Sequence, residues 1–499
     1  MKLDALLTQA KLPVPDRAAG RDVRAIAYDS RKVKEGSLFV AIPGFHRDGT
    51  DFIPDAEKAG AVAVVAQRKV RAKVPVVVAA DVRAALADLS AEFFDHPTEK
   101  LKVVGVTGTD GKTTTVHLVS DVLEVAGERT GYATTVDFKL ADHEWQNDTR
   151  QSTQEALELE EFCAELLVAG GTWGVLEATS HALALRKIRG IDVDVAVFTN
   201  LSPEHLDFHG TLQAYLEAKG ILFEMLTAGR DKGVAKTAVL NADDPHWRYL
   251  ADRAAGSRII TYGIDAPSDV QATILAADAN GSRLKVTAFG EAVELRLPLV
   301  GRFNVHNALA ATGAGIAAGA TLAQCRDALA RAKPVRGRMD RIDAGQPFTV
   351  IVDYAHTPES LEKVLALLRP LTAGKLIAVF GSAGERDRTK RPRLAAVASK
   401  YADSFVITQE DPRLEDPAAI LAEIEAGALE AGKQRDRDYR VIDDRTAAIN
   451  AAIADASEGD TVLLAGKGHE GSIIVGEEMR PWDEAAAARA ALRARGFAA

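Results

Sequence analysis

The chain has 499 residues, a formal net charge of −10 at pH 7, 47% hydrophobic residues and 26% charged residues. This length predicts two to four domains, and the ordinary balance of apolar and charged residues excludes a disordered or fibrous protein. The negative charge gives no support to a general nucleic-acid or membrane-surface role, although local anion sites remain possible.

The two cysteines, Cys163 and Cys325, lie far apart and match no metal-binding spacing, which fits a reducing compartment. Residues Met1–Pro15 lack the long apolar core of a signal peptide, and no apolar run is long enough to span a bilayer. We therefore expect a cytoplasmic protein that does not insert into a membrane.

The first hundred residues mix short β-like runs with turns, as at Gly36–Gly44 and Gly60–Ala66. His96–Lys100 is typical of a linker, and from Leu101 apolar strands alternate with helical stretches. The expected strands of this second unit are 101–108, 173–179, 193–201 and 236–244. This alternation predicts a mainly parallel sheet with helices on both faces.

Residues 269–298 are β-rich and predict a small antiparallel addition, and Asn304–Gly319 predicts an alanine-rich, closely packed helix. A second boundary falls near Lys333–Asp340. After it comes another α/β series, whose expected strands lie in 348–357, 375–384, 404–413 and 461–470. The prediction is an α/β protein of three domains, 1–98, 99–335 and 336–499. Each strand of the last series ends in polar residues, at the edge where open α/β sheets bind ligands.

The segment "GTDGKTTT" (Gly108–Thr115) follows a strand and opens a helix that ends at Gly127. Glycines let successive N–H groups and the helix N-terminus point at a phosphate, while Lys112 reaches the terminal phosphates and Thr113 holds Mg²⁺. Val106 stands where the P-loop pattern has glycine, so this is a shorter variant of that loop. The alternative is a glycine-rich turn with solvated side chains.

The predicted helix at Gly210–Leu226 carries Lys219 within its apolar stripe. The lysine either packs its stem and extends its amine to solvent, or it has a function in a buried place. Upstream, a polar cluster contains His205, Asp207 and His209, and another at the end of a strand contains Glu177 and His181. These groups either cap loops or supply carboxylate and imidazole ligands for the cation that a triphosphate needs.

Eight ordered motifs make the chain resemble the Mur ligase family over nearly its whole length, and the similarity is greatest to the branch that adds a diamino acid. The motifs are "DSRKVKEGSLFVAIPG", "GTDGKTTT", "EATSHAL", "VFTNLSPEHLDFHGTLQAYLEAK", "GRFNVHNALAA", "DYAHTP", "GERDRTKRP" and "AGKGHE". The resemblance implies an N-terminal UDP-binding α/β domain, a central P-loop-type ATPase domain with a parallel sheet, and a C-terminal Rossmann-like α/β domain.

The resemblance also implies the reaction, which belongs to peptidoglycan synthesis, and with it cell-wall biogenesis, cell shape and cell division. ATP would phosphorylate the D-glutamate γ-carboxylate of UDP-N-acetylmuramoyl-L-alanyl-D-glutamate. The amine of a diamino acid would then attack, and a tetrahedral intermediate would lose phosphate. The enzyme's task is alignment and charge neutralisation. We expect a monomer that uses ATP and Mg²⁺ and has no nucleic-acid partner.

The family pattern assigns roles residue by residue. Catalytic roles fall to Lys112, Glu177, His209 and a carbamylated Lys219. The metal ligands would be Thr113, Glu177, His209 and Lys219. ATP would contact Gly108, Thr109, Asp110, Gly111, Lys112, Thr113, Thr114, Asn304, Asn307, Arg338 and Asp353, with His356 near the domain junction.

On the UDP-sugar-peptide side the matching residues are Ser30, Ser152, Thr153, Thr179 and Lys187. Three of these depart from the family pattern, which usually has threonine for Ser152, serine for Thr179 and arginine for Lys187. Hydroxyl groups and a cation are retained, so we expect retained function with altered geometry. Lys187 lacks the forked hydrogen bonding of an arginine.

The diamino acid would be selected by Arg386, Glu410, Asp411, Pro412, Arg413, Gly466 and Glu470. Arg413 suits the distal carboxylate of meso-diaminopimelate. However, "EDPR" stands where the diaminopimelate-adding form typically has Asp-Asn-Pro-Arg. The added acid, Asp411, either favours the distal amine of lysine or ornithine, or pairs with Arg413 and weakens its hold on substrate. We favour meso-diaminopimelate.

Two alternatives remain at this point. One is a ligase like folylpoly-γ-glutamate synthetase, against which the N-terminal "DSR…LFVAIPG" unit argues. The other is a catalytically inactive relative that serves as a binding protein, against which the intact Lys112, Glu177, His209 and Lys219 argue.

Overall fold

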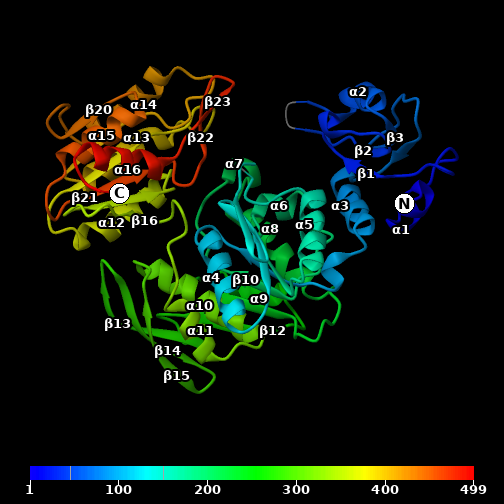
Figure 1. Cartoon of the computed structure of the whole chain (residues 1–499), viewed down its shortest axis with the longest axis horizontal. Helices are drawn as coiled ribbons and strands as arrows, with labels where there is room; N and C mark the ends of the chain where they lie inside the picture. Colours follow the sequence, from blue (N-terminus) through cyan, green and yellow to red (C-terminus); the bar gives the residue numbers. More distant parts are fainter. Residues whose placement is uncertain (45–46, 150, 499) are drawn as a thin grey trace.

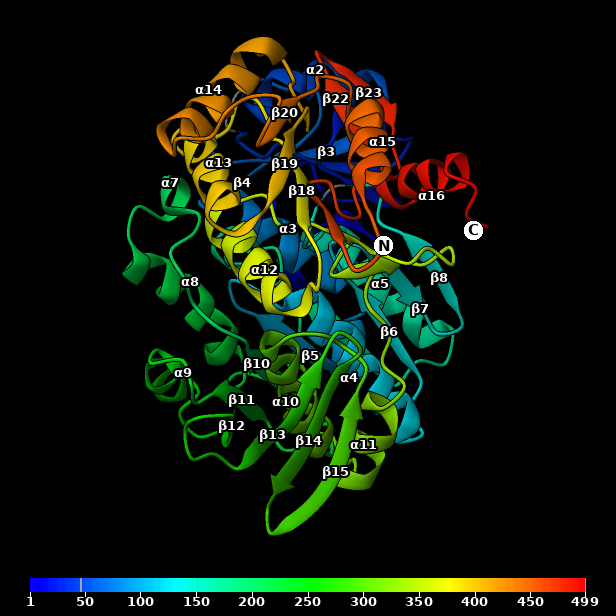
Figure 2. The same ribbon diagram turned by 90° about the vertical axis from the view of Figure 1, so that its left-hand side faces the viewer.

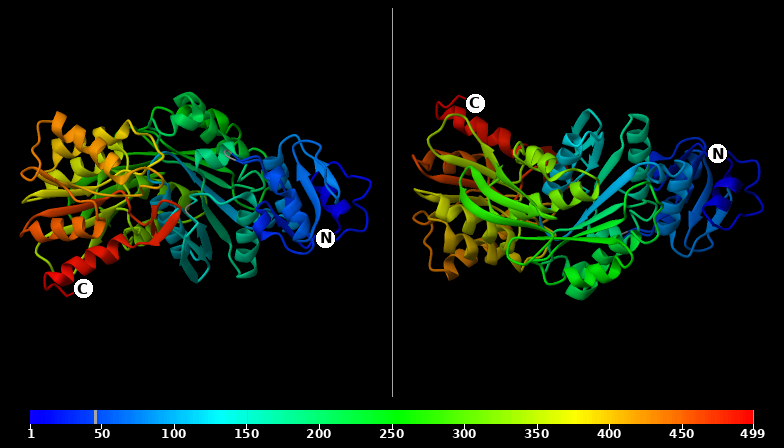
Figure 3. Two further views of the ribbon diagram at one scale, coloured as in Figure 1. Left: turned by 90° about the horizontal axis from the view of Figure 1, so that it is seen from above. Right: turned by 90° about the horizontal axis from the view of Figure 1, so that it is seen from below.

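The computed structural model describes residues 1–44, 47–149 and 151–498. Three α/β units lie in a row, with the N-terminus in the unit at one end and the C-terminus in the unit at the other (Figures 1 and 3). Each unit has its own sheet, and the three sheets fall within the three predicted domains. The limits at residues 98/99 and 335/336 themselves stay predictions.

The N-terminal sheet has four parallel strands in the order β1-β2-β3-β4. The strands are β1 (Ala25–Ala27), β2 (Ser37–Val40), β3 (Ala61–Ala66) and β4 (Val76–Val78). Helices α1 (Leu3–Gln9) and α3 (Val82–Phe93) bury apolar side chains against one face, and α2 (Ile53–Lys58) covers the other. The Asp81 carboxylate caps α3 by accepting hydrogen bonds from the N–H groups of Arg83 and Ala84.

The central sheet has eleven strands in the order β15-β14-β13-β12-β11-β10-β5-β9-β6-β7-β8. Its parallel part contains β5 (Lys102–Thr107), β6 (Thr130–Ala133), β9 (Trp173–Glu177), β10 (Val195–Phe198), β11 (Thr237–Asn241), β12 (Arg258–Gly263) and β13 (Val270–Asp278). Its antiparallel additions are β7 (Asp137–Leu140), β8 (His143–Gln146), β14 (Gly281–Ala288) and β15 (Glu291–Leu297). The β-rich segment predicted at 269–298 is therefore confirmed as β13–β15, which extend away from the other units in Figure 2.

Helices cover both faces of the central sheet, as the strand pattern predicted. One face packs against α4 (Lys112–Val125), α10 (Arg302–Ala317) and α11 (Leu322–Leu329). The other packs against α5 (Ala156–Val168), α6 (Ser180–Ala184), α8 (Leu212–Met225) and α9 (Trp247–Arg253). The close packing predicted for α10 is confirmed, because a Cβ at Gly313 would lie only 2.7 Å from a methyl of Val239.

The C-terminal sheet has the order β16-β17-β21-β18-β19-β20, and only its edge strand β16 is antiparallel. The strands are β16 (Asp340–Ile342), β17 (Thr349–Asp353), β18 (Leu376–Phe380), β19 (Ser404–Ile407), β20 (Tyr439–Val441) and β21 (Thr461–Ala465). Helices α12 (Pro358–Leu371), α13 (Lys390–Tyr401) and α14 (Pro417–Glu430) cover one face. Helices α15 (Arg445–Asp455) and α16 (Glu484–Ala494) cover the other, and β22 (Ser472–Val475) and β23 (Glu478–Pro481) form a separate hairpin.

The segment before β16 belongs structurally to the C-terminal unit. Gly337 has φ +67°, and a Cβ there would lie 2.8 Å from Cα of Gly468. Next to it, the Arg338 guanidinium stacks 4.6 Å from the ring centroid of Tyr354, and Met339 N–H donates to Asp353 at 2.7 Å. Only glycine allows this close contact of the connecting segment with the loop after β21.

The N-terminal and central units meet where α3 packs against α5, as Figure 1 shows. Tyr28 O–H donates to the Glu158 carboxylate across this junction at 2.6 Å. In the same junction the Glu160 side chain is 1% exposed, and its carboxyl has no hydrogen-bond partner among the described residues. Burial raises the pKa of this carboxyl to about 8, from an ordinary value of 4.5.

A carboxyl whose pKa is higher in the folded chain favours folding while it is protonated. We expect its contribution to the free energy of unfolding to be fully present below about pH 4.5. It should be lost as the pH rises to about 8, at roughly 1.4 kcal/mol per pH unit at most. Glu160→Gln carries no charge, so its thermal midpoint should fall less between pH 5 and pH 8 than that of the wild type. The exposed Glu165→Gln on the same helix is the control, and an equal fall in all three proteins would contradict the assignment.

None of the helices among the described residues is long and apolar enough to cross a membrane.

Candidate functional site

The loop after β5 forms a backbone cradle at the N-terminus of α4. Gly111 has φ +84°, and a Cβ there would clash with the Asn307 side-chain oxygen. The loop is tied to the end of β10, because Thr109 N–H donates to Asn200 O at 2.8 Å and Asp110 N–H to the Asn200 side chain at 3.0 Å. This fixed turn at a helix N-terminus suits the phosphates of a nucleotide.

Lys112, the first residue of α4, folds back over this loop. Its Nζ donates to the carbonyl oxygens of Thr109 at 2.8 Å and Gly108 at 3.2 Å. The ammonium group therefore lies at the mouth of the cradle without a carboxylate partner among the described residues. It is placed to contact a phosphate oxygen.

The Glu177 side chain, at the end of β9, is 3% exposed. Its Oε2 accepts hydrogen bonds from the Thr113 hydroxyl, the Thr135 N–H and the Thr135 hydroxyl, each at 3.0 Å. The predicted metal ligands Thr113 and Glu177 are therefore in direct contact. Thr135 was not among the predicted residues.

Lys219 in α8 is 1% exposed, so the alternative in which its amine extends to solvent is wrong. Its Nζ donates to Gly108 O at 2.7 Å and lies 4.1 Å from the ring centroid of Tyr215. Burial lowers the pKa of the Lys219 ammonium well below its usual value, and the positive charge of Lys112 lowers it further. Lys219 is thus an amine under the phosphate loop that favours its neutral form.

Three histidines gather beside these lysines. The ring centroid of His181 lies 4.7 Å from that of His205 and 5.3 Å from that of His209. Burial lowers the pKa of each imidazole to about 4, and Lys112 and Lys219 further disfavour a charge on His205. His209 Nε2 pairs with the Ser180 hydroxyl at 2.9 Å, so the structure joins it to the first residue of α6 rather than to Glu177 directly.

The residues predicted near the adenine and ribose come from two units. Asn307 donates to the Asn304 side chain at 3.1 Å, next to the phosphate loop. Asp353 lies across the domain junction, where burial raises the pKa of its carboxyl although Arg338 opposes this effect. The predicted His356 pairs with Tyr354 O at 2.9 Å, and burial with the charge of Lys390 lowers its imidazole pKa to about 4.

Four of the five residues predicted for the UDP-sugar-peptide side lie together next to the Glu177 backbone. Thr153 donates to Glu177 O at 2.7 Å, and its hydroxyl lies 3.3 Å from that of Thr179. Lys187 donates to Thr153 O at 3.2 Å and pairs with Glu155 at 3.1 Å, and Ser152 precedes Thr153. Ser30 lies in the N-terminal unit, at the start of a short 3₁₀ turn.

The predicted amino-acid residues meet at the carboxyl end of the C-terminal sheet. Buried Lys467 pairs with Asp411 at 2.8 Å and with Glu470 at 2.5 Å. Gly466 lies against the Glu410 carboxylate, whose Oε2 is buried without a hydrogen-bond partner among the described residues. Pro412 and Arg413 follow Asp411, while Arg386 is exposed on the neighbouring loop after β18.

The backbone of Arg413 is held by the β22–β23 hairpin. Its N–H donates to Ile474 O at 3.0 Å, and its carbonyl accepts from Gly476 N–H at 2.8 Å. Arg413 Nε is buried without a hydrogen-bond partner in the part of the chain that the structure describes. The guanidinium therefore has donor capacity left for a ligand.

Polar contacts between described residues join the central unit to the C-terminal unit. Lys363 of α12 pairs with Asp110 at 2.5 Å, and Gln146 donates to His469 O at 3.4 Å. The sequence pattern gave no signal for Lys363, because it is an ordinary charged position on a helix. The units that carry the predicted nucleotide and amino-acid residues are thus in direct contact.

Comparisons with known proteins agree with this geometry. Residues 22–94 match the model described as Mur ligase family, catalytic domain, residues 106–315 match the Mur ligase middle domain, and residues 337–468 match the Mur ligase, glutamate ligase domain. A UDP-N-acetylmuramyl-tripeptide synthetase of Roseiflexus sp. (strain RS-1) is 49% identical over 507 residues, covering 100% of both chains. The chain belongs to the Mur ligase family.

Two further relatives extend this result. A UDP-N-acetylmuramoyl-L-alanyl-D-glutamate–2,6-diaminopimelate ligase of Geobacillus thermodenitrificans is 44% identical, covering 99% of this chain and 100% of its own. A solved structure of a ligase with the same name has a TM-score of 0.69 and 30% identity, covering 100% of both chains. As a Mur ligase, the protein is an ATP-dependent, ADP-forming acid–amino-acid ligase, so the alternative of a catalytically inactive protein finds no support.

The site of this Mur ligase fits a nucleotide and a cation. The Gly111 cradle has no room for a Cβ, and Lys112 stands over it. Within the described ranges, no group of three or more His, Cys, Asp or Glu side chains could hold a metal by itself. Mg²⁺ commonly takes one or two carboxylates and completes its shell with phosphate oxygens and water, and the Thr113–Glu177 pair fits that pattern.

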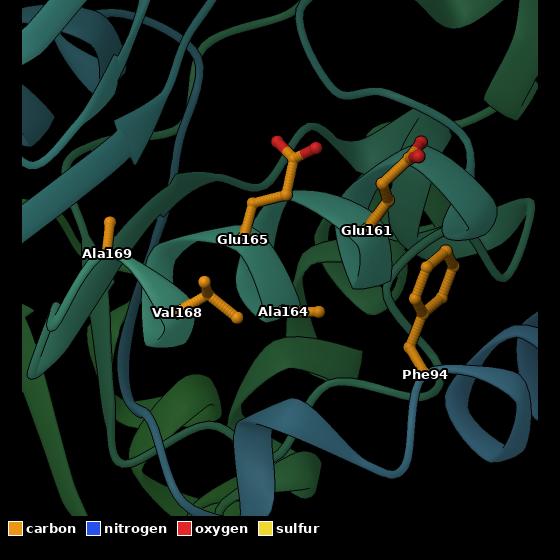
Figure 4. A pocket seen from close by; sticks show the side chains of 6 residues that line it. All are labelled: Phe94, Glu161, Ala164, Glu165, Val168 and Ala169. Atoms are coloured by element: carbon orange, nitrogen blue, oxygen red, sulfur yellow. The ribbon is translucent and has the colours of Figure 1, made fainter.

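A surface cavity of about 350 Å³ lies away from these residues, on the outer side of α5 (Figure 4). Its lining residues are Phe94, Glu161, Ala164, Glu165, Val168 and Ala169. None of them is a predicted site residue.

Proposed function

We propose that this protein joins meso-diaminopimelate to the D-glutamate γ-carboxylate of UDP-N-acetylmuramoyl-L-alanyl-D-glutamate, a step of peptidoglycan synthesis. The observation that carries the choice of amino acid is the buried pair between Lys467 and Asp411. The relatives named as diaminopimelate ligases support it. We also propose a monomer in the cytoplasm.

The Lys467–Asp411 pair shows where the added acid of the "EDPR" segment lies. Lys467 is fully buried and the Asp411 side chain is 4% exposed, and Asp411 also accepts a hydrogen bond from Ile474 N–H at 3.0 Å. Lys467 therefore offsets part of the negative charge that would attract the distal amine of lysine or ornithine, although it also pairs with Glu470. Arg413 keeps free donor capacity for a distal carboxylate, which diaminopimelate has and lysine lacks.

In the proposed reaction, an oxygen of the γ-carboxylate forms a bond to the terminal phosphorus of ATP, and ADP leaves. The amine then forms a bond to the acyl carbon of this acyl phosphate. The amine loses its proton, the carbon–phosphate oxygen bond breaks, and an amide and inorganic phosphate result. A bound Mg²⁺ would offset the charge of the phosphates.

The residues of the chain divide these tasks. The N–H groups at the N-terminus of α4 orient the phosphates, and Lys112 offsets the charge that develops on them. Thr113 and Glu177 would hold the cation, and His209 and Lys219 would complete the family's metal set, with Lys219 as a carbamate. A neutral, buried amine is the form that reacts with carbon dioxide, which supports that modification.

The N-terminal unit favours this proposal over a ligase like folylpolyglutamate synthetase. Its motif includes Ser30, and the unit is held to the central unit through Tyr28 and Glu158. A domain that binds UDP has a use only if the acceptor carries a UDP-sugar.

The decisive experiment measures phosphate release with UDP-muramoyl-dipeptide and meso-diaminopimelate, L-lysine or L-ornithine in turn. Mass spectrometry identifies the product by its mass. We expect the highest kcat/KM with meso-diaminopimelate. A preference for lysine or ornithine would refute the amino-acid assignment, and no ligation with any of the three would refute the function.

Arg413→Ala should raise KM for meso-diaminopimelate by about 10- to 100-fold, because hydrogen bonds to charged groups contribute about 1.5–3 kcal/mol. The residual use of L-lysine should change little, since lysine has no distal carboxylate. Arg413→Lys is the matched variant, and it should recover only part of the loss because an ammonium lacks the planar fork. Steady-state phosphate release measures KM for both amino acids in the wild type, Arg413→Ala and Arg413→Lys. If Arg413→Ala raised KM equally for meso-diaminopimelate and L-lysine, Arg413 would not contact the distal group.

A further inference from the structure

Among the described residues, one oxygen of the Glu177 carboxylate accepts every hydrogen bond that this carboxylate makes. Three donors converge on Oε2, namely the Thr113 hydroxyl and both the N–H and the hydroxyl of Thr135, each at 3.0 Å. Oε1 accepts no hydrogen bond from the described residues. The two oxygens of this buried carboxylate therefore have different surroundings.

Thr135 belongs to a tight turn between β6 and β7 that is stabilised by hydrogen bonds within the turn. The Thr134 hydroxyl donates toward two acceptors of Asp137, its carbonyl oxygen at 2.9 Å and its carboxylate at 2.8 Å. The Thr134 hydroxyl also accepts from the N–H groups of Val136 at 3.1 Å and Asp137 at 3.0 Å. His117 of α4 anchors Asp137 at 2.9 Å, so the turn is also tied to the helix that begins at Lys112.

Buried Asn147 fixes the other side of this turn. Its side-chain amide donates to Thr134 O at 2.7 Å and to Gln151 O at 2.9 Å, just before the predicted substrate residues Ser152 and Thr153. A turn with this many internal bonds presents the Thr135 donors in one place at low entropic cost.

We infer that Thr135 is a positioning residue for Glu177. Its hydroxyl and N–H hold Oε2, which fixes the carboxylate plane and leaves Oε1 as the oxygen that binds the cation. Thr113 is compatible with this arrangement, because a hydroxyl that binds a cation through a lone pair keeps a proton to donate. The inference rests on the proposed role of Glu177 as a metal ligand.

Thr135→Val removes only the hydroxyl and keeps the side-chain shape, and Thr135→Ser restores the hydroxyl. We expect Thr135→Val to weaken Mn²⁺ binding in the presence of ADP by about 10- to 100-fold, the usual effect of losing a group that orients a ligand. Electron paramagnetic resonance of free Mn²⁺ measures this binding without turnover. The Mg²⁺ concentration for half-maximal activity should rise in parallel, and Thr135→Ser should return both values close to those of the wild type.

Two further variants separate the possible outcomes. Thr172→Val, an exposed threonine far from the site, is the matched control and should bind Mn²⁺ as the wild type does. Glu177→Gln tests the proposed role of Glu177 as a metal ligand, on which the inference about Thr135 rests. If Glu177→Gln leaves Mn²⁺ affinity unchanged, the metal role of Glu177 is wrong. If Glu177→Gln weakens binding but Thr135→Val does not, the metal role stands and the positioning role of Thr135 is overturned.

Discussion

Replacement of Lys112 by alanine should lower kcat by about 10²- to 10³-fold, the scale found when a single preorganised donor to developing charge is removed. Lys112 Nζ already lies over the loop in which the phosphates would bind. It donates to Thr109 O at 2.8 Å and to Gly108 O at 3.2 Å. Few rearrangements are therefore needed before it neutralises phosphate charge. Phosphate release with saturating ATP, UDP-muramoyl-dipeptide and diamino acid is the measurement.

The exposed Lys375→Ala serves as the control for this experiment, because it removes an equal charge at a surface position in the C-terminal unit. Its kcat should match that of the wild type. The thermal midpoint of Lys112→Ala should also stay close to the wild-type value, which separates lost catalysis from lost folding. A rate within a few-fold of the wild type would show that the loop Gly108–Gly111 is only a turn.

Replacement of Lys219 by alanine should also reduce kcat by about 10²- to 10³-fold, since it removes a group that lies under the phosphate loop. If the native side chain is a carbamate, the missing negative charge can be supplied from solution. Acetate or formate should then restore part of the activity, whereas chloride at equal ionic strength should not.

The wild-type protein supplies an independent test of the same idea. Removal of carbon dioxide and bicarbonate should lower its activity slowly, and added bicarbonate should restore it. The mass of the intact chain should rise by one carbamate when the modification is trapped. If neither short carboxylates nor bicarbonate have any effect, Lys219 acts as an unmodified amine.

Much of the fold follows from local patterns. The strands and the helix after "GTDGKTTT" lie where apolar runs and glycines predicted them, because buried parallel strands and helix N-termini have strong local signals. The cradle itself was predictable from Gly108, Gly111 and Lys112. Spacing alone left two alternatives for Lys219, and only the packing of α8 against the phosphate loop decides between them.

The remaining parts of the site depend on contacts between distant segments. Thr135 reaches Glu177 across 42 positions of sequence, and Lys467 reaches Asp411 across 56. The first contact requires β6 to lie beside β9, which lies between it and β5. No local pattern in the sequence specifies that strand order, so threonine and lysine at these positions carry no signal by themselves.

The contact of Gly337 with Gly468 has a consequence for motion between the units. Gly337 is locked against the loop after β21, and Arg338 and Met339 are held by Tyr354 and Asp353. These residues must travel with the C-terminal sheet as one rigid piece. Any rotation of that sheet about the connecting segment therefore pivots upstream of Gly337, and Arg338, which we propose contacts the nucleotide, moves with the sheet.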